Sequence, residues 1–259
     1  MTCLDRGTAK ADASAEDRIA ALKAELAGLR AEMQEFTSTV SHDLRAPLRH
    51  IVSYAQMVQE DAGPLLTEEV QEFLATITSS ARHMGLLLDG LTVLSRVGSV
   101  ALHLEQVALQ DAVQEACDRL ACEHPSRVVD WQVQTGLPVV RADGSLLQLV
   151  LAELLGNALK FTAPRGQAVI AVRAAPSEQV GQVVLQVQDN GVGFNPAMQD
   201  HLFQVFGRLH SAQQFEGIGM GLVLAYKRLQ RMGGLLAIDA VVEGGCCVTL
   251  TLPLDLPLG

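Results

Sequence analysis

The stretch DNGVGF, residues 189–194, is the most informative segment of this 259-residue chain. It follows directly on residues 182–188, in which apolar and polar side chains alternate as in a β-strand. Two glycines let the backbone approach a ligand closely, and an aspartate at a strand end can accept a hydrogen bond from an exocyclic amine. The stretch therefore predicts a ligand-binding loop, although the same letters also form ordinary turns.

A second glycine-rich stretch, GIGMGL at residues 217–222, opens a predicted helix. Free backbone amides at a helix N-terminus beside glycines form an anion site that suits phosphates. The stretch is not a Walker loop, because no Gly-Lys-Ser/Thr follows it. It is not a Rossmann fingerprint either, because no parallel βαβ unit surrounds it.

A third stretch, ELLGNALKF at residues 153–161, lies in a predicted helix. Its side chains Glu153, Asn157 and Lys160 are spaced i, i+4 and i+7, so they project from one face. A carboxylate, an amide oxygen and an ammonium on one face suit a Mg²⁺-phosphate, in which oxygens hold the metal and the ammonium meets the phosphate. Taken alone, a solvated polar stripe explains this face at least as well.

Short β-like runs alternate with helical runs throughout residues 103–256, where these stretches lie. Helices grouped with a largely antiparallel sheet make an α+β sandwich. The predicted strands are 104–107, 128–133, 139–141, 168–174, 182–188, 235–240 and 248–252, and the predicted helices are 109–121, 145–160 and one that begins near Gly219.

The N-terminal part shows apolar residues at alternating spacings of three and four, which is the seam of a coiled coil. The seam consists of Ile19, Leu22, Leu26, Leu29, Met33, Phe36 and Val40. We expect a coiled-coil signalling helix over residues 15–40, preceded by a disordered start or a remnant of cloning over residues 1–14. One amphipathic helix packed on its own chain is the alternative, but three regular heptads favour a dimer.

His42 lies on the continuation of this helix, nearly opposite its apolar stripe, which predicts an exposed histidine. DAGPL at residues 61–65 breaks the helix, and a second amphipathic helix follows Thr67, a predicted N-cap. Two helices cannot bury two apolar stripes, whereas two hairpins from two chains can. We therefore expect a dimeric four-helix bundle over residues 36–97.

Composition limits the class of protein. The 19 Lys and Arg residues against 29 Asp and Glu give a formal net charge of -10. This argues against a nucleic-acid partner, because phosphate neutralisation needs clustered positive charge. The five cysteines lack zinc spacing and fit a reducing compartment. No apolar stretch approaches the roughly 18 to 20 residues of a spanning helix, so we expect a cytoplasmic location, with any membrane or sensor segment outside this chain.

Together, the three stretches resemble the N, G1 and G2 boxes of the GHKL, or Bergerat, ATP-binding fold, with FQVF at residues 203–206 similar to the F box between them. Upstream, SHDLRAPL at residues 41–48 is similar to the H box of sensor histidine kinases of the HisKA type. Residues 206–222 look most like the bacteriophytochrome-type subgroup. The resemblance covers about residues 15–255. It implies a helical-hairpin dimerisation domain followed by an α/β-sandwich ATP-binding domain.

The resemblance also implies a role for each polar site residue. His42 would be the phosphoacceptor, and Asp43 would accept from its Nδ1–H and fix the tautomer. Asp189 would bind the adenine amine. Asn157 would ligate Mg²⁺, and Glu153 would order a metal-bound water or assist the proton transfer.

The phosphates of ATP would meet Lys160 and the glycines. Arg208, in the expected lid at residues 208–216, either contacts phosphate or is a surface arginine. The glycines that would admit the nucleotide and border its triphosphate are Gly191, Gly193, Gly217, Gly219 and Gly221.

The activity that the resemblance implies is ATP-dependent autophosphorylation of His42 in a homodimer, followed by transfer to an aspartate of a response regulator receiver domain. An upstream sensor domain would lie outside this chain. Ala46 stands where kinases that also dephosphorylate their partner carry Thr or Asn, which predicts weak phosphatase activity. Two alternatives stay open: a degenerate kinase that binds nucleotide as a scaffold, and an ATP-hydrolysing relative of DNA gyrase or mismatch-repair enzymes.

Overall fold

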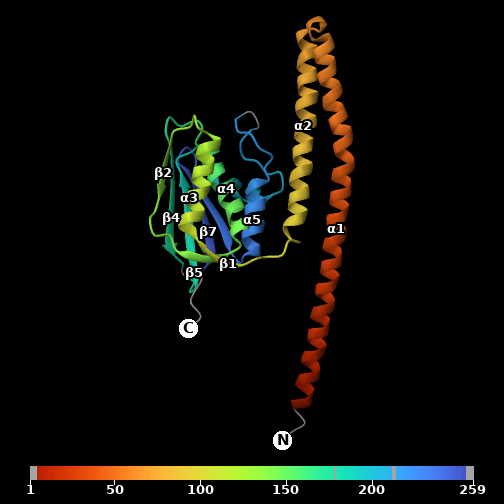
Figure 1. Cartoon of the computed structure of the whole chain (residues 1–259). Helices are drawn as coiled ribbons and strands as arrows, with labels where there is room; N and C mark the ends of the chain where they lie inside the picture. Colours follow the sequence, from red (N-terminus) through yellow and green to blue (C-terminus); the bar gives the residue numbers. More distant parts are fainter. Residues whose placement is uncertain (1–4, 178, 212–213, 255–259) are drawn as a thin grey trace. The chain divides into compact units, whose positions relative to one another are not determined.

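The computed structural model describes residues 5–177, 179–211 and 214–254, with side chains from residue 17 onward. The chain divides into two compact units, and the boundary falls between Arg96 and Val97. Figure 1 shows a helical hairpin in the first unit and a sheet covered by helices in the second. Among the described residues, no helix combines the length and the apolar character that a membrane span requires.

The first unit consists of two long helices, α1 (Asp5–Ala62) and α2 (Glu68–Val97), joined by the short 3-10 helix η1 (Gly63–Leu65). The helix break predicted over residues 61–65 is confirmed, because α1 ends at Ala62 and Pro64 follows in η1.

The first residues of α1 and of α2 differ in how they match the predictions. Thr67 caps α2 as predicted, because its Oγ1 accepts from the backbone N–H of Val70 at 3.4 Å. The disordered start expected over residues 1–14 is wrong for residues 5–14, which belong to α1. An established helix gains one hydrogen bond for each residue that it adds, so it extends easily into this alanine-containing segment. Residues 1–4 lie outside the described residues.

The two helices pack against each other largely through small side chains. Many large apolar residues of the seam and stripes stay exposed, as Leu22 at 57% and Phe73 at 56% illustrate, while others such as Leu48 and Leu88 are half-buried. A single hairpin thus leaves much apolar surface in contact with solvent. The buried residues of the two helices are Thr37, Ser41 and Ala55 of α1 and Thr78, Ala81, Gly90 and Thr92 of α2.

The second unit is the α+β sandwich that the sequence predicts. Its five-stranded sheet has the order β2-β4-β5-β7-β6, in which only the β2–β4 pair is parallel, and β1 and β3 form a separate antiparallel pair. The elements are β1 (Glu105–Ala108), α3 (Leu109–Glu123), β2 (Val129–Val133), β3 (Val139–Ala142), α4 (Gly144–Phe161), β4 (Ala168–Pro176), β5 (Gln182–Asp189), η2 (Pro196–Phe203), α5 (Gly221–Arg231), β6 (Leu235–Val241) and β7 (Gly245–Pro253).

Helices α3, α4 and α5 lie on one face of the five-stranded sheet (Figure 1). The central helix α4 is capped by Asp143, whose carboxylate accepts from the backbone N–H of Leu146 at 3.0 Å. One side of α4, which includes Leu151 and Leu155, is fully buried in the core. Because this side is fixed against the sheet, the opposite polar side of α4 is held in a defined position.

Candidate functional site

The polar side of α4 lies against the glycine-rich turn at residues 217–221. Gly221 approaches Glu153 so closely that a Cβ atom on Gly221 would overlap the Glu153 carboxylate. A Cβ atom on Gly217 would lie 3.7 Å from Nζ of Lys160. Two stretches more than 50 residues apart in the sequence therefore form one polar surface.

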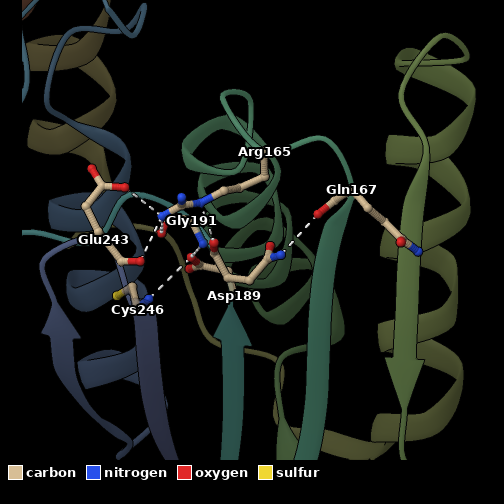
Figure 2. A network of polar contacts seen from close by, with 7 residues as sticks. Arg165, Gln167, Asp189, Gly191, Glu243 and Cys246 are labelled. Atoms are coloured by element: carbon tan, nitrogen blue, oxygen red, sulfur yellow. Dashed lines mark hydrogen bonds and ion pairs between the residues drawn. The ribbon is translucent and has the colours of Figure 1, made fainter.

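Asp189 ends β5 and is buried, with 7% of its surface exposed. Its Oδ1 accepts from the backbone N–H of Gly191 at 2.8 Å and from that of Cys246 at 3.3 Å (Figure 2). Burial raises the pKa of the Asp189 carboxyl from 3.8 to about 6, although both hydrogen bonds favour the charged form. Both bonds end on Oδ1, so Oδ2 is the oxygen that can accept from a ligand.

The glycines near Asp189 are required by close backbone approaches. Gly193 has a φ of 60°, and a Cβ atom there would overlap the carbonyl oxygen of Val241. Gly245 has a φ of 90°, and a Cβ atom there would overlap the carbonyl oxygen of Asp189. Any side chain at these positions would push the loop after β5 away from the β6–β7 turn.

The end of α4 connects the Asp189 loop to the polar surface. The backbone N–H of Val192 donates to the carbonyl oxygen of Phe161 at 3.2 Å. A Cβ atom on Gly191 would lie 2.7 Å from the same carbonyl oxygen. All three informative stretches of the sequence therefore meet at α4.

Charges of both signs are partly buried on this surface. Burial raises the pKa of the Glu153 carboxyl, while the charges of Arg228 and Lys160 act in the opposite direction. Burial lowers the pKa of the Lys160 ammonium, and the charge of Glu153 opposes that shift. The amide of Asn157 lies between Glu153 and Lys160 on α4. Together the three side chains offer two oxygen donors for a metal ion and one cation for an anionic group.

The segment before the glycine-rich turn packs onto the end of α4 through aromatic rings. The ring centroids of Phe161 and Phe215 lie 5.0 Å apart, and the His210 ring lies 5.4 Å from Phe161 and 5.2 Å from Phe215. Arg208 donates to the carbonyl oxygens of Phe215 and Gly217. Arg208 therefore fastens its own segment, a role that the sequence analysis did not consider.

His42 lies on α1 in the first unit with 84% of its side chain exposed. Its position opposite the apolar stripe predicts this exposure. Nδ1 of His42 lies 3.2 Å from Oδ1 of Asp43. One turn further along α1, Arg45 bonds to Asp89 of α2, with Nη2 2.7 Å and Nε 3.2 Å from Oδ1. The structure thus leaves Nε2 of His42 accessible while Nδ1 faces a carboxylate.

The sequence analysis missed two contributors to the Asp189 site. Cys246 supplies a backbone donor, and the preceding pair Gly244-Gly245 is the signal that could have indicated a close approach there. Arg165 contacts the loop after Asp189 (Figure 2). No local pattern identifies Arg165, because its partners lie 25 and more residues away.

Asp189→Asn is expected to stabilise the second unit at pH 7.5 by up to about 3 kcal/mol, because the amide keeps the acceptor oxygen but carries no buried charge. The native state holds the Asp189 proton more tightly than the unfolded chain does. The free energy of unfolding therefore falls as the pH rises from about 4 to about 6, and the gain should disappear near pH 4. Urea unfolding followed by the fluorescence of Trp131, the only tryptophan, measures the free energy of unfolding of this unit.

Asp239→Asn is the matched control, since Asp239 lies exposed on β6 of the same sheet. It should change the free energy of unfolding by no more than about 0.5 kcal/mol. An Asp189→Asn variant that is less stable than the parent at pH 7.5 would contradict the assignment of a desolvated carboxylate.

Comparison with known proteins identifies both units. Residues 142–256 match the family model of the histidine kinase-, DNA gyrase B- and HSP90-like ATPases. Residues 32–100 match the His Kinase A (phospho-acceptor) domain. The second unit is thus an ATP-binding domain of this ATPase type, and the first is a phosphoacceptor domain.

Curated relatives match nearly the whole chain. The chain is 32% identical over 244 residues to the methanogenesis regulatory histidine kinase FilI of Methanothrix harundinacea, and the match covers 94% of this chain and 27% of the relative. It is 28% identical to cyanobacterial phytochrome B of Nostoc sp., covering 91% of this chain and 31% of the relative. The chain therefore spans about a third or less of these relatives, and the phytochrome match is compatible with the resemblance of residues 206–222.

Solved structures share the fold. Full-length ShkA in complex with AMPPNP aligns with a TM-score of 0.59 at 23% identity, covering 85% of this chain and 45% of that one. The Acinetobacter baumannii histidine kinase AdeS aligns with a TM-score of 0.57 at 18% identity, covering 83% of this chain and 98% of that one. With both domain matches in this order, the chain belongs to the sensor histidine kinase family.

Proposed function

We propose that this chain is the catalytic core of a two-component sensor kinase, which phosphorylates His42 with ATP and passes the phosphoryl group to an aspartate of a response regulator. The observation that carries the proposal is an accessible His42 with its Nδ1 beside Asp43, in one chain with an ATP-binding domain. A scaffold would need neither an exposed imidazole nor an oriented tautomer.

The adenine of ATP binds at Asp189 in this proposal. The buried carboxylate accepts from the exocyclic amine through Oδ2, and the glycine-bordered loop lets the base come close to the backbone. The triphosphate lies along the turn at 217–221, whose backbone precedes α5. Lys160 supplies a positive charge to it.

Mg²⁺ fits the donor set on α4, because Asn157 and Glu153 offer an amide oxygen and a carboxylate one turn apart. Asn157 would ligate the ion directly, and Glu153 would hold a water bound to it. The described residues contain no cluster of three or more His, Cys, Asp or Glu that could hold a metal alone. When bound, Mg²⁺ neutralises charge on the phosphates.

Phosphoryl transfer requires a neutral imidazole with its lone pair on Nε2. Asp43 accepts the Nδ1–H bond, which leaves Nε2 unprotonated and nucleophilic. The Nε2 lone pair forms the new bond to the γ-phosphorus, the bond to the bridging oxygen breaks, and that electron pair leaves with ADP. The protein contributes position and charge neutralisation to this step.

A homodimer is the assembly that the first unit supports. Coiled-coil seam residues such as Ile19, Leu29 and Phe36 are more than half exposed in the single hairpin. A second hairpin would cover them and complete a four-helix bundle. The seam also gives an upstream sensor domain a helix through which to act on His42.

Incubation with γ-labelled ATP and Mg²⁺ tests the proposal. We expect the chain to take up a label that is labile in acid and stable in base, and His42→Gln to abolish it. His50→Gln is the matched control, because His50 is an exposed histidine two turns further along α1. Label that persists in His42→Gln would contradict the assigned nucleophile, and ATP hydrolysis without label would favour a gyrase-like ATPase.

Ala46→Thr is expected to raise the phosphatase activity toward a phosphorylated receiver domain by about tenfold or more. Ala46 lies one turn after His42 on α1 and has no side-chain group to orient a water. The measurement is the decay of phosphate from a receiver domain that this kinase has itself labelled. Ala46→Val has nearly the same shape as Ala46→Thr without the hydroxyl, so an equal gain in both variants would refute the water-orienting explanation.

A further inference from the structure

Arg165 follows α4 and lies among oxygen atoms of two distant turns. Its Nε donates to the carbonyl oxygen of Asn190 at 2.9 Å. Its Nη2 lies 2.9 Å from the carbonyl oxygens of Gly191 and Glu243 and 2.9 Å from Oε2 of Glu243 (Figure 2). We call this set of contacts the Arg165 clamp. It joins the loop after β5 to the turn between β6 and β7.

The turn between β6 and β7, which the clamp holds, contains an unfavourable backbone conformation. Glu243 has a φ of 58°, a region that side chains other than glycine rarely adopt. Its own N–H donates to the carbonyl oxygen of Val192 at 2.7 Å, while its carbonyl accepts from Arg165. Such a conformation persists only where surrounding contacts enforce it. The N–H of Glu243 is thus tied directly to the loop after β5, and its carbonyl is tied to that loop through Arg165.

The loop after β5, which the clamp also holds, is fixed to the sheet. The side chain of Asn190 accepts from the backbone N–H of Val169 at 3.0 Å and donates to the carbonyl oxygen of Gln167 at 3.0 Å. Figure 2 shows the second of these bonds beside the clamp. The loop is therefore attached to the start of β4 and the residue before it, as well as to Arg165.

The two turns joined by the clamp each supply one donor to Asp189. Gly191 belongs to the loop after β5, and Cys246 stands three residues after Glu243 at the start of β7. The separation of these two N–H groups decides whether both can reach Oδ1 at once. A wider separation would release one donor and let the carboxylate turn.

We infer that Arg165 is the positioning residue of the adenine site: by holding the two turns together it fixes the direction in which Oδ2 of Asp189 meets the base. The inference rests on the proposed binding of adenine at Asp189. The carbonyl contacts carry the effect, because the Glu243 carboxylate is 70% exposed and an exposed ion pair contributes little.

Nucleotide selectivity distinguishes positioning from mere structural support. Adenine offers an amine to Asp189, whereas the base of ITP presents a carbonyl oxygen at that position. If the carboxylate is misdirected, the site no longer discriminates between ATP and ITP. A general loss of structure instead weakens the binding of both nucleotides equally. The ratio of the ATP and ITP dissociation constants is therefore the decisive readout.

The experiment uses the full chain with Mg²⁺ and compares Arg165→Met, Arg165→Lys, Glu243→Gln and, as a control, Arg173→Met on the exposed side of β4. Calorimetry gives the dissociation constants, and labelled ATP at saturation gives the phosphorylation rate. We expect Arg165→Met to weaken ATP binding by about tenfold and to reduce the preference for ATP over ITP by a similar factor. The phosphorylation rate at saturating ATP should change less than about twofold. Glu243→Gln and Arg173→Met should change the ATP dissociation constant less than about threefold.

Arg165→Lys keeps the charge but lacks the planar fork with which Arg165 reaches three carbonyl oxygens, so it should restore only part of the preference. It also keeps the test decisive if Arg165→Met does not fold. An unchanged ATP to ITP ratio in the folded Arg165 variants would overturn the inference. If the parent chain itself binds neither nucleotide, the proposed function fails instead.

Discussion

The carboxylate of Asp189 is held by two backbone N–H groups that come from different turns, and the candidate site depends on this arrangement. Oδ1 accepts from Gly191 and from Cys246, which are 55 residues apart in the chain. A buried charge is tolerated only where hydrogen bonds compensate part of the lost hydration. The glycines at 193 and 245 serve the same arrangement, because each lets one turn approach the other. The buried carboxylate is thus held at a cost in stability.

The two units place their functional side chains in opposite environments. The nucleotide domain removes polar groups from water, so Asp189, Glu153 and Lys160 all have a pKa shifted by burial. The helical hairpin instead leaves His42 in solvent, where a separate domain can reach it. Small residues between α1 and α2 let the helices pack closely, and the exposed large apolar residues are available for a second copy. Phosphoryl transfer in the proposed kinase needs both environments in one chain.

Features set by local patterns could be predicted from the sequence. The helix break at 61–65, the cap at Thr67 and the shared face of Glu153 and Lys160 follow from residue type and helical period. Features set by contacts through space could not be predicted. Arg165, with partners 25 to 78 residues away, and the stack of Phe161, His210 and Phe215 belong to this group. The helical start of α1 could not be predicted from its own residues, because it depends on propagation of the helix that follows it.

The dependence of nucleotide preference on pH tests most directly whether Asp189 recognises adenine. ATP and ITP carry the same triphosphate, so the ratio of their association constants isolates the contact with the base. Above about pH 6 the ionised carboxylate accepts from the adenine amine, and below it the protonated carboxyl can donate to the carbonyl of ITP. Calorimetric titrations from pH 5 to pH 8 should therefore show the preference for ATP falling as the pH drops through about 6. A ratio that stays constant over this range would contradict the account.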